Sequence, residues 1–139
     1  QMAQACWAIS RRFHQGGRLI AFGNGAWATD AQHVSVEFVH PVIVGKRALP
    51  AIALTNDSAM LVAGGGNRSQ LMPFAQQLAT LARPQDMAMG FSPDGNCQNV
   101  IIALNQARKR GLIQETHETL YHVLWELVHI FFEHEGLLV

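Results

Sequence analysis

Apolar residues follow two patterns along the chain, and each pattern predicts a different kind of element. Apolar residues at every third or fourth position predict amphipathic helices, and short apolar runs bounded by glycine or proline predict buried strands. The predicted helices lie at residues 3–13, 29–39, 72–81 and 99–111. The predicted strands lie at residues 18–22, 48–55 and 86–92. Strand, turn and helix recur three times, which predicts an α/β fold with a parallel sheet flanked by helices on both faces.

The C-terminal part of the sequence departs from this alternation. After Gly111 a further strand is expected, but Leu112 begins a long run whose apolar residues cover most of a helical circumference, LIQETHETLYHVLWELVHIFFEHEGLL. The run predicts one long helix that packs on more than one surface and forms a subunit contact as well as part of the core. At 139 residues, nearly half of them apolar, the chain is expected to form a single domain over residues 1–139.

Charge and composition argue against several classes of partner. Lysine plus arginine equals aspartate plus glutamate, so the chain lacks the basic character that binding to nucleic acid or an anionic membrane requires. No apolar stretch resembles a bilayer span. The two cysteines, Cys6 and Cys97, form no CxxC motif and have no metal-ligand spacing, which favours a reducing, cytoplasmic location. We therefore expect neither a nucleic-acid nor a membrane partner.

Glycine turns follow two of the predicted strands. The first is Gly23-Asn24-Gly25, and the second contains Gly95 and Asn96. Each turn leads into a predicted helix, whose first N–H groups and positive dipole end can hold a phosphate without any lysine. Because parallel strands end at the same edge of a sheet, both turns are expected to face one crevice. This arrangement favours a phosphate or sugar site.

A histidine and a glutamate form a second candidate site. His33 and Glu37 are four residues apart on a predicted helix, so they share one face and are close enough for a hydrogen bond or for joint metal coordination. A local pair on a solvated face is the alternative, and the spacing alone does not decide between the two. The sequence contains no GxSxG motif, no Walker lysine and no Cys–His nucleophile signature.

The C-terminal run contains four further histidines. His117 and His122 are five residues apart, whereas a zincin motif needs a spacing of four, so this interpretation is rejected. His122 and His129 share a helix face, where Glu118 or Glu126 could satisfy either of them as a simple interfacial histidine. The sequence leaves open whether His129 and His134 do anything beyond packing at an interface.

Several segments together resemble the SIS (sugar isomerase) domain family, and most closely its phosphoheptose isomerase branch. The matching segments are GGRLIAFGNGAWATDAQHVSVEF, RALPAIALTND, LARPQDMAMGFSPDGNCQNVIIALNQARKRG and IQETHETLYHVLWELV. They span almost the entire chain in the family's order. The resemblance implies a three-layer, flavodoxin-like fold and a homotetramer with sites made from more than one subunit. It also implies the interconversion of sedoheptulose 7-phosphate and an aldoheptose phosphate through an enediol.

The resemblance assigns roles to individual residues. The family's catalytic base and acid match Glu37 and His122, because these positions fall in its H-x-x-x-E and Q-E-x-H-x-x-x-x-H helices. Some members bind zinc, and the matching ligands are His33, Glu37, Gln114 and His122. The substrate-binding positions of the two family loops match Asn24, Gly25, Trp27, Ser92, Asp94 and Asn96.

Both loops depart from the family pattern in a way that changes their phosphate chemistry. Trp27 replaces the serine of the family's GNGGSA loop, and in the segment that matches STSGNS only Ser92 keeps its hydroxyl. A carboxylate at Asp94 repels a phosphate, and as a helix N-cap it would bind the same N–H donors. Pro41 stands where an arginine commonly follows the glutamate helix.

The resemblance also implies that some N-terminal helix and a strand-loop-helix piece of roughly 30 residues between Gly111 and Leu112 are absent from this sequence. The expected reason is either a true deletion in the protein or a sequence that omits part of it. The leading hypothesis is a phosphoheptose-type isomerase with an altered phosphate loop. The alternatives are a non-catalytic SIS module that binds a sugar phosphate or a protein partner, and an isomerase for a different, unphosphorylated sugar.

Overall fold

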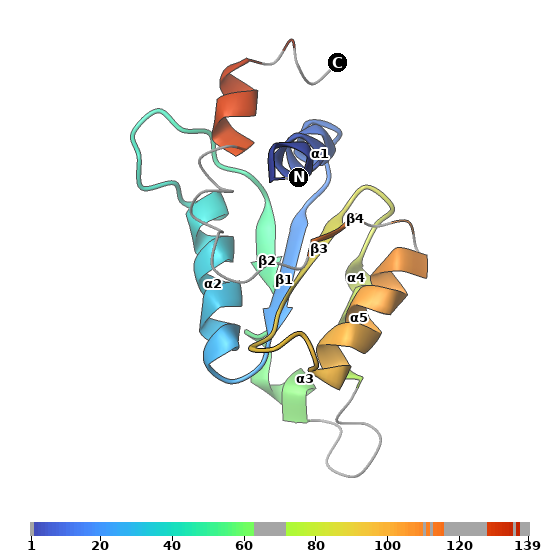
Figure 1. Cartoon of the computed structure of the whole chain (residues 1–139). Coiled ribbons are helices and arrows are strands. Elements are labelled where there is room, and N and C mark those ends of the chain that lie inside the picture. Colours follow the sequence, from blue (N-terminus) through green and yellow to red (C-terminus); the bar gives the residue numbers. More distant parts are fainter. Residues whose placement is uncertain are drawn as a thin grey trace.

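The structure, a computed structural model, describes residues 2–62, 72–109, 111, 128–134 and 136, together with the backbone of residues 113–115. In this part of the chain a four-stranded parallel sheet has the order β2-β1-β3-β4 (Figure 1). The strands are β1 (Leu19–Gly23), β2 (Ala51–Ala53), β3 (Met87–Phe91) and β4 (Ile113–Glu115). The helices are α1 (Met2–His14), α2 (Ala26–Val39), α3 (Ser58–Val62), α4 (Pro73–Leu81) and α5 (Gln98–Lys109). The predicted strand–helix alternation is confirmed up to α5, whereas the short helix α3 and the short strand β4 had no sequence signal.

Two apolar clusters fill the space on the two faces of the sheet. Leu19 and Ala21 of β1 pack with residues of α1 and α2, whereas Ile20 and Phe22 of the same strand pack with residues of α4 and α5. All five residues of β1 are buried, as the unbroken apolar run predicted. Figure 1 shows α2 and α5 on opposite sides of the sheet. The three-layer arrangement is therefore confirmed.

The register of the two central strands determines where their loops meet. β1 and β3 pair over their full length, from Leu19 opposite Met87 to Gly23 opposite Phe91, so the two strands end at the same level. β2 lies on the other side of β1, which makes the space between the ends of β1 and β3 a topological switch point. Ligands of open parallel sheets bind at such a point.

Glycine allows one close approach between layers. A Cβ atom on Gly90 in β3 would lie 2.7 Å from Cγ1 of Val100 and 3.2 Å from Cδ1 of Leu104. Any larger residue at position 90 would push α5 away from the sheet, because a buried strand has no room for the extra volume. The close packing of α5 on β3 thus requires glycine at position 90.

The segment after Gly111 corrects the predicted long helix. Ile113–Glu115 forms β4, which pairs in parallel with β3, so Gln114 and Glu115 lie in a strand and not in a helix. The physical reason is the open edge of β3, whose backbone groups need a partner in the buried centre of the sheet. Residues 128–133 are helical, in agreement with the end of the predicted run. Among the described residues, no helix has both the length and the apolar character that a bilayer crossing requires.

Candidate active site

The turn after β1 is built from two glycines with different tasks. A Cβ atom on Gly23 would lie 2.7 Å from the carbonyl oxygen of Trp27 and 3.0 Å from Cβ of Phe91, so only glycine fits between the strand end and the first turn of α2. Gly25, immediately before α2, has a φ of 55°, which L-residues with side chains rarely adopt. The two glycines bring the chain sharply from β1 into α2 and present Asn24 at the edge of the sheet.

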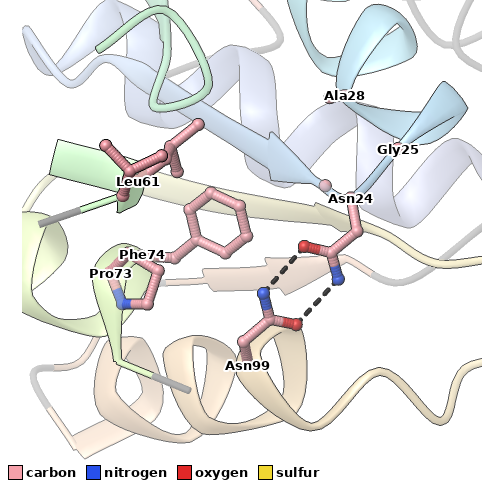
Figure 2. A pocket seen from close by; sticks show the side chains of 9 residues that line it. Asn24, Gly25, Ala28, Leu61, Pro73, Phe74 and Asn99 are labelled. Carbon is pink, nitrogen blue, oxygen red and sulfur yellow. Dashed lines mark hydrogen bonds between the residues drawn. The ribbon is translucent and has the colours of Figure 1, made fainter. Parts of the chain in front are cut away.

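A cavity of about 510 Å³ lies beside this turn (Figure 2). One side is formed by the turn, the start of α2 and the start of α5, through Gly23, Asn24, Gly25, Ala28 and Asn99. The other side is apolar and comes from α3 and α4, through Leu61, Val62, Pro73 and Phe74. The cavity therefore combines amide groups with an apolar wall, a common composition for a small-molecule site.

Two asparagines face each other at the rim of the cavity. Nδ2 of Asn24 donates to Oδ1 of Asn99 at 2.7 Å, and Nδ2 of Asn99 donates to Oδ1 of Asn24 at 2.7 Å. Oδ1 of Asn99 also accepts the N–H of Val100 at 3.0 Å, which fixes which end of this amide carries the oxygen. The loop after β1 and the first turn of α5 are thus joined side chain to side chain.

In the second predicted loop, the side chains of Asp94 and Ser92 accept N–H groups of the loop itself. Asp94 accepts the N–H of Asn96 at 2.9 Å and its Nδ2 at 3.3 Å, and these bonds, the backbone one first, hold the pKa of Asp94 below its usual value. Oγ of the buried Ser92 accepts the N–H of Cys97 at the longer distance of 3.5 Å. Because α5 begins only at Gln98, Asp94 closes an Asx turn and does not cap the helix, which corrects the prediction. The expectation that Asp94 occupies loop N–H groups is confirmed for the N–H of Asn96.

His33 and Glu37 form a contact on α2. Nε2 of His33 and Oε1 of Glu37 are 3.1 Å apart, and the side chain of Glu37 is 15% exposed against 50% for His33. Ala28 on the same helix lines the cavity, and Glu37 lies nine residues further, which is about half a circumference away and roughly 13 Å along the axis. The pair therefore faces away from the cavity of its own chain.

The remaining predicted residues are spread over the molecule. Trp27 is half-buried and packs against the apolar cluster that α1 and α2 form on one face of the sheet. It is not among the residues that line the cavity. The backbone of Gln114 lies in β4, which packs against α1 and α5, whereas α2 packs on β1, β2 and β3. His122 lies outside the described residues. Among the described residues, no three histidine, cysteine, aspartate or glutamate side chains converge as a metal site.

His129, whose role the sequence left open, is buried within its own chain. Its side chain is 1% exposed, its ring stacks on Phe38 of α2 with centroids 6.1 Å apart, and Nε2 lies 3.1 Å from the carbonyl oxygen of Arg47. His129 therefore packs within its own chain, against Phe38, which is the residue next to Glu37 on α2. His134, in contrast, is exposed.

Sequence reasoning missed Asn99 and the apolar wall of the cavity. Asn99 is a polar residue in the first turn of a helix that follows a central strand, which is a usable signal for a ligand loop. Its partner, 75 positions away, became visible only with the sheet order. Leu61 and Phe74 looked like ordinary core residues, because the cavity beside them arises from the way that α3 and α4 pack.

Comparisons with known proteins agree with this architecture. The SIS domain family model matches residues 1–113. The chain is 36% identical to a phosphoheptose isomerase of Thermodesulfovibrio yellowstonii, over 90% of this chain and 78% of the relative. It is also 36% identical to a phosphoheptose isomerase of Solidesulfovibrio magneticus, over 86% of this chain and 73% of the relative.

Solved structures are similar over most of their length. Phosphoheptose isomerase GmhA from Neisseria gonorrhoeae superposes with a TM-score of 0.77 at 25% identity, covering 91% of this chain and 84% of that one. A phosphoheptose isomerase from Francisella tularensis shares the fold with a TM-score of 0.82 at 22% identity, covering 93% and 85%. The chain belongs to the SIS domain family, and its relatives within that family are phosphoheptose isomerases.

Proposed function

We propose that this protein is an aldose–ketose isomerase of the phosphoheptose type, which interconverts sedoheptulose 7-phosphate and an aldoheptose 7-phosphate. The observation that carries the proposal is the 36% identity to phosphoheptose isomerases over 90% of the chain. The fold supports it, because the cavity, with Asn24 and Asn99 at its rim, lies at the switch point between β1 and β3.

The proposed reaction moves one proton between two adjacent carbons. Glu37 as a carboxylate takes the proton from the carbon next to the carbonyl, the electron pair forms the carbon–carbon double bond, and His122 delivers a proton to the carbonyl oxygen. The resulting enediol collapses in the reverse sense at the neighbouring carbon to give the isomer. The contact with His33 supports the role of Glu37, because it holds one carboxylate oxygen in place while the side chain stays largely shielded from water.

A second copy of the chain is proposed to complete each site. Glu37 faces away from the cavity of its own chain, so a substrate held at Asn24 meets a Glu37 from another copy. Next to Glu37, Val36 and Val39 are 54% and 49% exposed, and the loop after α2 exposes Val42 and Val44 still further. Exposed apolar residues that gather beside a catalytic group favour a subunit interface there, and we propose a homotetramer.

Zinc is proposed as a cofactor, held by His33, Glu37, Gln114 and His122. The described pair fits such a site, because one imidazole nitrogen and one carboxylate oxygen lie 3.1 Å apart on one helix face. Bound zinc would polarise the carbonyl oxygen as a Lewis acid. Metal analysis of the purified protein tests the ligand set: His33→Ala is expected to lower the zinc content, and unchanged zinc content would exclude His33 as a ligand.

Two further proposals concern the chain as a whole. The alignment with the Thermodesulfovibrio relative runs over 156 residues, although 90% of this 139-residue chain amounts to about 125, which supports a segment of the relatives that is missing inside this chain. A cytoplasmic location is supported by the cysteines, since Cys6 and Cys97, both in the described part of the chain, are not joined by a disulfide.

The activity is tested with purified protein, sedoheptulose 7-phosphate and detection of the aldose product by NMR. The wild type is expected to turn over, and Glu37→Gln is expected to lose activity by at least about a thousandfold, because the amide cannot accept the proton. Gln32→Ala, an exposed position on the same helix, is the matched control and is expected to keep full activity. A wild-type protein without turnover, or an active Glu37→Gln variant, would contradict the proposed mechanism.

A further inference from the structure

Asn99 is a residue at the cavity to which the isomerase resemblance assigned no role. It lies in the first turn of α5, is half-buried, and its amide is one of only two side-chain amides among the described residues that line the cavity. Its two hydrogen bonds to Asn24 are short and reciprocal, and each amide both donates and accepts once. Figure 2 shows the pair bridging the loop after β1 and the helix α5.

The N–H of Val100 determines how both amides of this pair are oriented. The N–H of Val100 requires an oxygen at Oδ1 of Asn99, so Nδ2 of Asn99 must point to Asn24. Asn24 then has to present its own oxygen to Asn99, because two N–H groups cannot bond to each other. The backbone of α5 thereby dictates the orientation of an amide that belongs to the loop after β1.

That loop needs such support. Gly23 and Gly25 flank Asn24, and glycines leave the backbone with more accessible conformations than any other residue. Within the described residues, the side chain of Asn24 makes two hydrogen bonds, both to Asn99. Loss of Asn99 would therefore release the amide of Asn24 to rotate at the rim of the cavity.

We propose that Asn99 is a positioning residue for the substrate: its amide clasps that of Asn24, and so fixes the ligand loop after β1 against the helix that follows β3. The inference rests on the proposed function only for the choice of ligand, a sugar phosphate. A preorganised loop binds with a smaller loss of conformational entropy, so the clasp acts mainly on substrate affinity. Each of the two asparagines then contributes through the other.

A double-mutant cycle with Asn24→Ala and Asn99→Ala tests this coupling, and the dissociation constant of sedoheptulose 7-phosphate is measured by calorimetry. In the otherwise wild-type chain, Asn99→Ala is expected to weaken binding by about tenfold, which corresponds to the loss of one to two hydrogen bonds. In the Asn24→Ala background the same change is expected to weaken binding by less than about twofold, because its partner is already gone. KM is expected to rise with little change in kcat.

Three controls separate positioning from other roles. Asn105→Ala, at an exposed position on the same helix, is expected to leave affinity unchanged. Asn99→Asp keeps the acceptor for Val100 and for Nδ2 of Asn24 but loses the donated bond and adds a negative charge at the cavity, so its affinity for sedoheptulose 7-phosphate is expected to fall at least as far as that of Asn99→Ala, with an unchanged thermal midpoint. The same measurements in the Glu37→Gln background give affinities without turnover.

The outcomes are distinct. Equal losses from Asn99→Ala in both backgrounds would mean that Asn99 acts independently of Asn24, and this would overturn the clasp. A lowered thermal midpoint with unchanged affinity would also overturn it, because the pair would then be structural only. If the ligand binds with the predicted coupling but the wild type shows no turnover, the Asn24–Asn99 pair keeps its positioning role. The isomerase proposal alone would then be wrong.

Discussion

Asp94 introduces a negative charge in the loop after β3, close to the edge where the phosphate of the substrate is expected to lie. The sequence was sufficient to predict that this carboxylate would take an N–H donor of the loop, because aspartate readily bonds to nearby backbone groups. The sequence was not sufficient to predict which N–H group Asp94 would bind. A helix capped by Asp94 would begin three residues earlier than α5 does. The start of α5 follows from its packing on β3 and has no local signal.

Removal of the charge at Asp94 is expected to strengthen phosphate binding. Asp94→Ser should raise the affinity for sedoheptulose 7-phosphate and for inorganic phosphate by about three- to fivefold at low salt, because an exposed carboxylate contributes only modest repulsion. The gain should shrink at high ionic strength. Calorimetric titrations at two salt concentrations measure both effects.

Asp94→Asn is the matched variant for this prediction. It removes the charge but keeps an oxygen that can accept the N–H of Asn96, so the turn is preserved. A gain in both variants assigns the effect to charge, and a gain in Asp94→Ser alone assigns it to the weaker bond that a serine hydroxyl makes to the N–H of Asn96. Unchanged affinity in both variants would show that Asp94 lies outside the phosphate site.

At the scale of elements, the two central strands are tied together at the end opposite the cavity. Asp86, which is fully buried, accepts the backbone N–H of Arg18 at 2.9 Å, the N–H of Arg83 at 2.9 Å and Nη2 of Arg18 at 2.7 Å. Burial alone raises the pKa of Asp86, but the side-chain hydrogen bond from Arg18 and the two backbone N–H groups outweigh it, so the net pKa lies below its usual value. The start of β1 is thus fixed to the start of β3.

Loss of this carboxylate is expected to destabilise the fold without affecting catalysis. Asp86→Asn should lower the free energy of unfolding by about 2 kcal/mol at pH 7, because buried donors lose a charged acceptor while Arg18 stays partly hydrated. Since the folded pKa is lowered, the contribution is present above the unfolded value of about 3.9 and is lost as the pH falls through the folded value. The difference between variant and wild type should therefore shrink below about pH 4.

Denaturant unfolding at pH 7 and at pH 3.5 measures this difference. Arg83→Ala is the control, because it keeps the backbone N–H that Asp86 accepts, and a change within about 0.5 kcal/mol is expected. A gap between wild type and Asp86→Asn that is equal at both pH values would show that the charge of Asp86 contributes nothing to folding.

The elements also show where sequence patterns suffice and where they fail. β1 and β3 are buried on both faces, and their unbroken apolar runs between glycine and polar residues identify them as strands. Ile113–Glu115 is only three residues long and opens a sequence with strong helical periodicity, so no local pattern marks it as a strand. It pairs with β3 because that strand offers an open edge, which is a property of the assembled sheet.

At the scale of the whole molecule, the cavity and Glu37 lie on opposite sides of α2, so the proposed isomerase would need sites shared between copies of the chain. A mixture of Glu37→Gln with Asn24→Ala tests this requirement, since each variant alone is expected to be inactive or weakly active. If one copy supplies Asn24 and another Glu37, random mixing should restore about a quarter of the wild-type activity, because that share of sites pairs two intact halves. Activity no higher than the sum of the two variants would place both residues in one chain.

Proton NMR of sedoheptulose 7-phosphate in deuterated buffer tests whether this protein transfers a proton between adjacent carbons of a sugar phosphate. If Glu37 is the base, as proposed, the proton that its carboxylate takes from carbon exchanges with solvent before it is returned. The wild type is then expected to place deuterium on the carbon next to the carbonyl while the aldose appears, and Glu37→Gln is expected to do neither. A folded wild-type protein that binds the sugar phosphate yet leaves every carbon-bound proton in place would show that the protein does not catalyse this proton transfer.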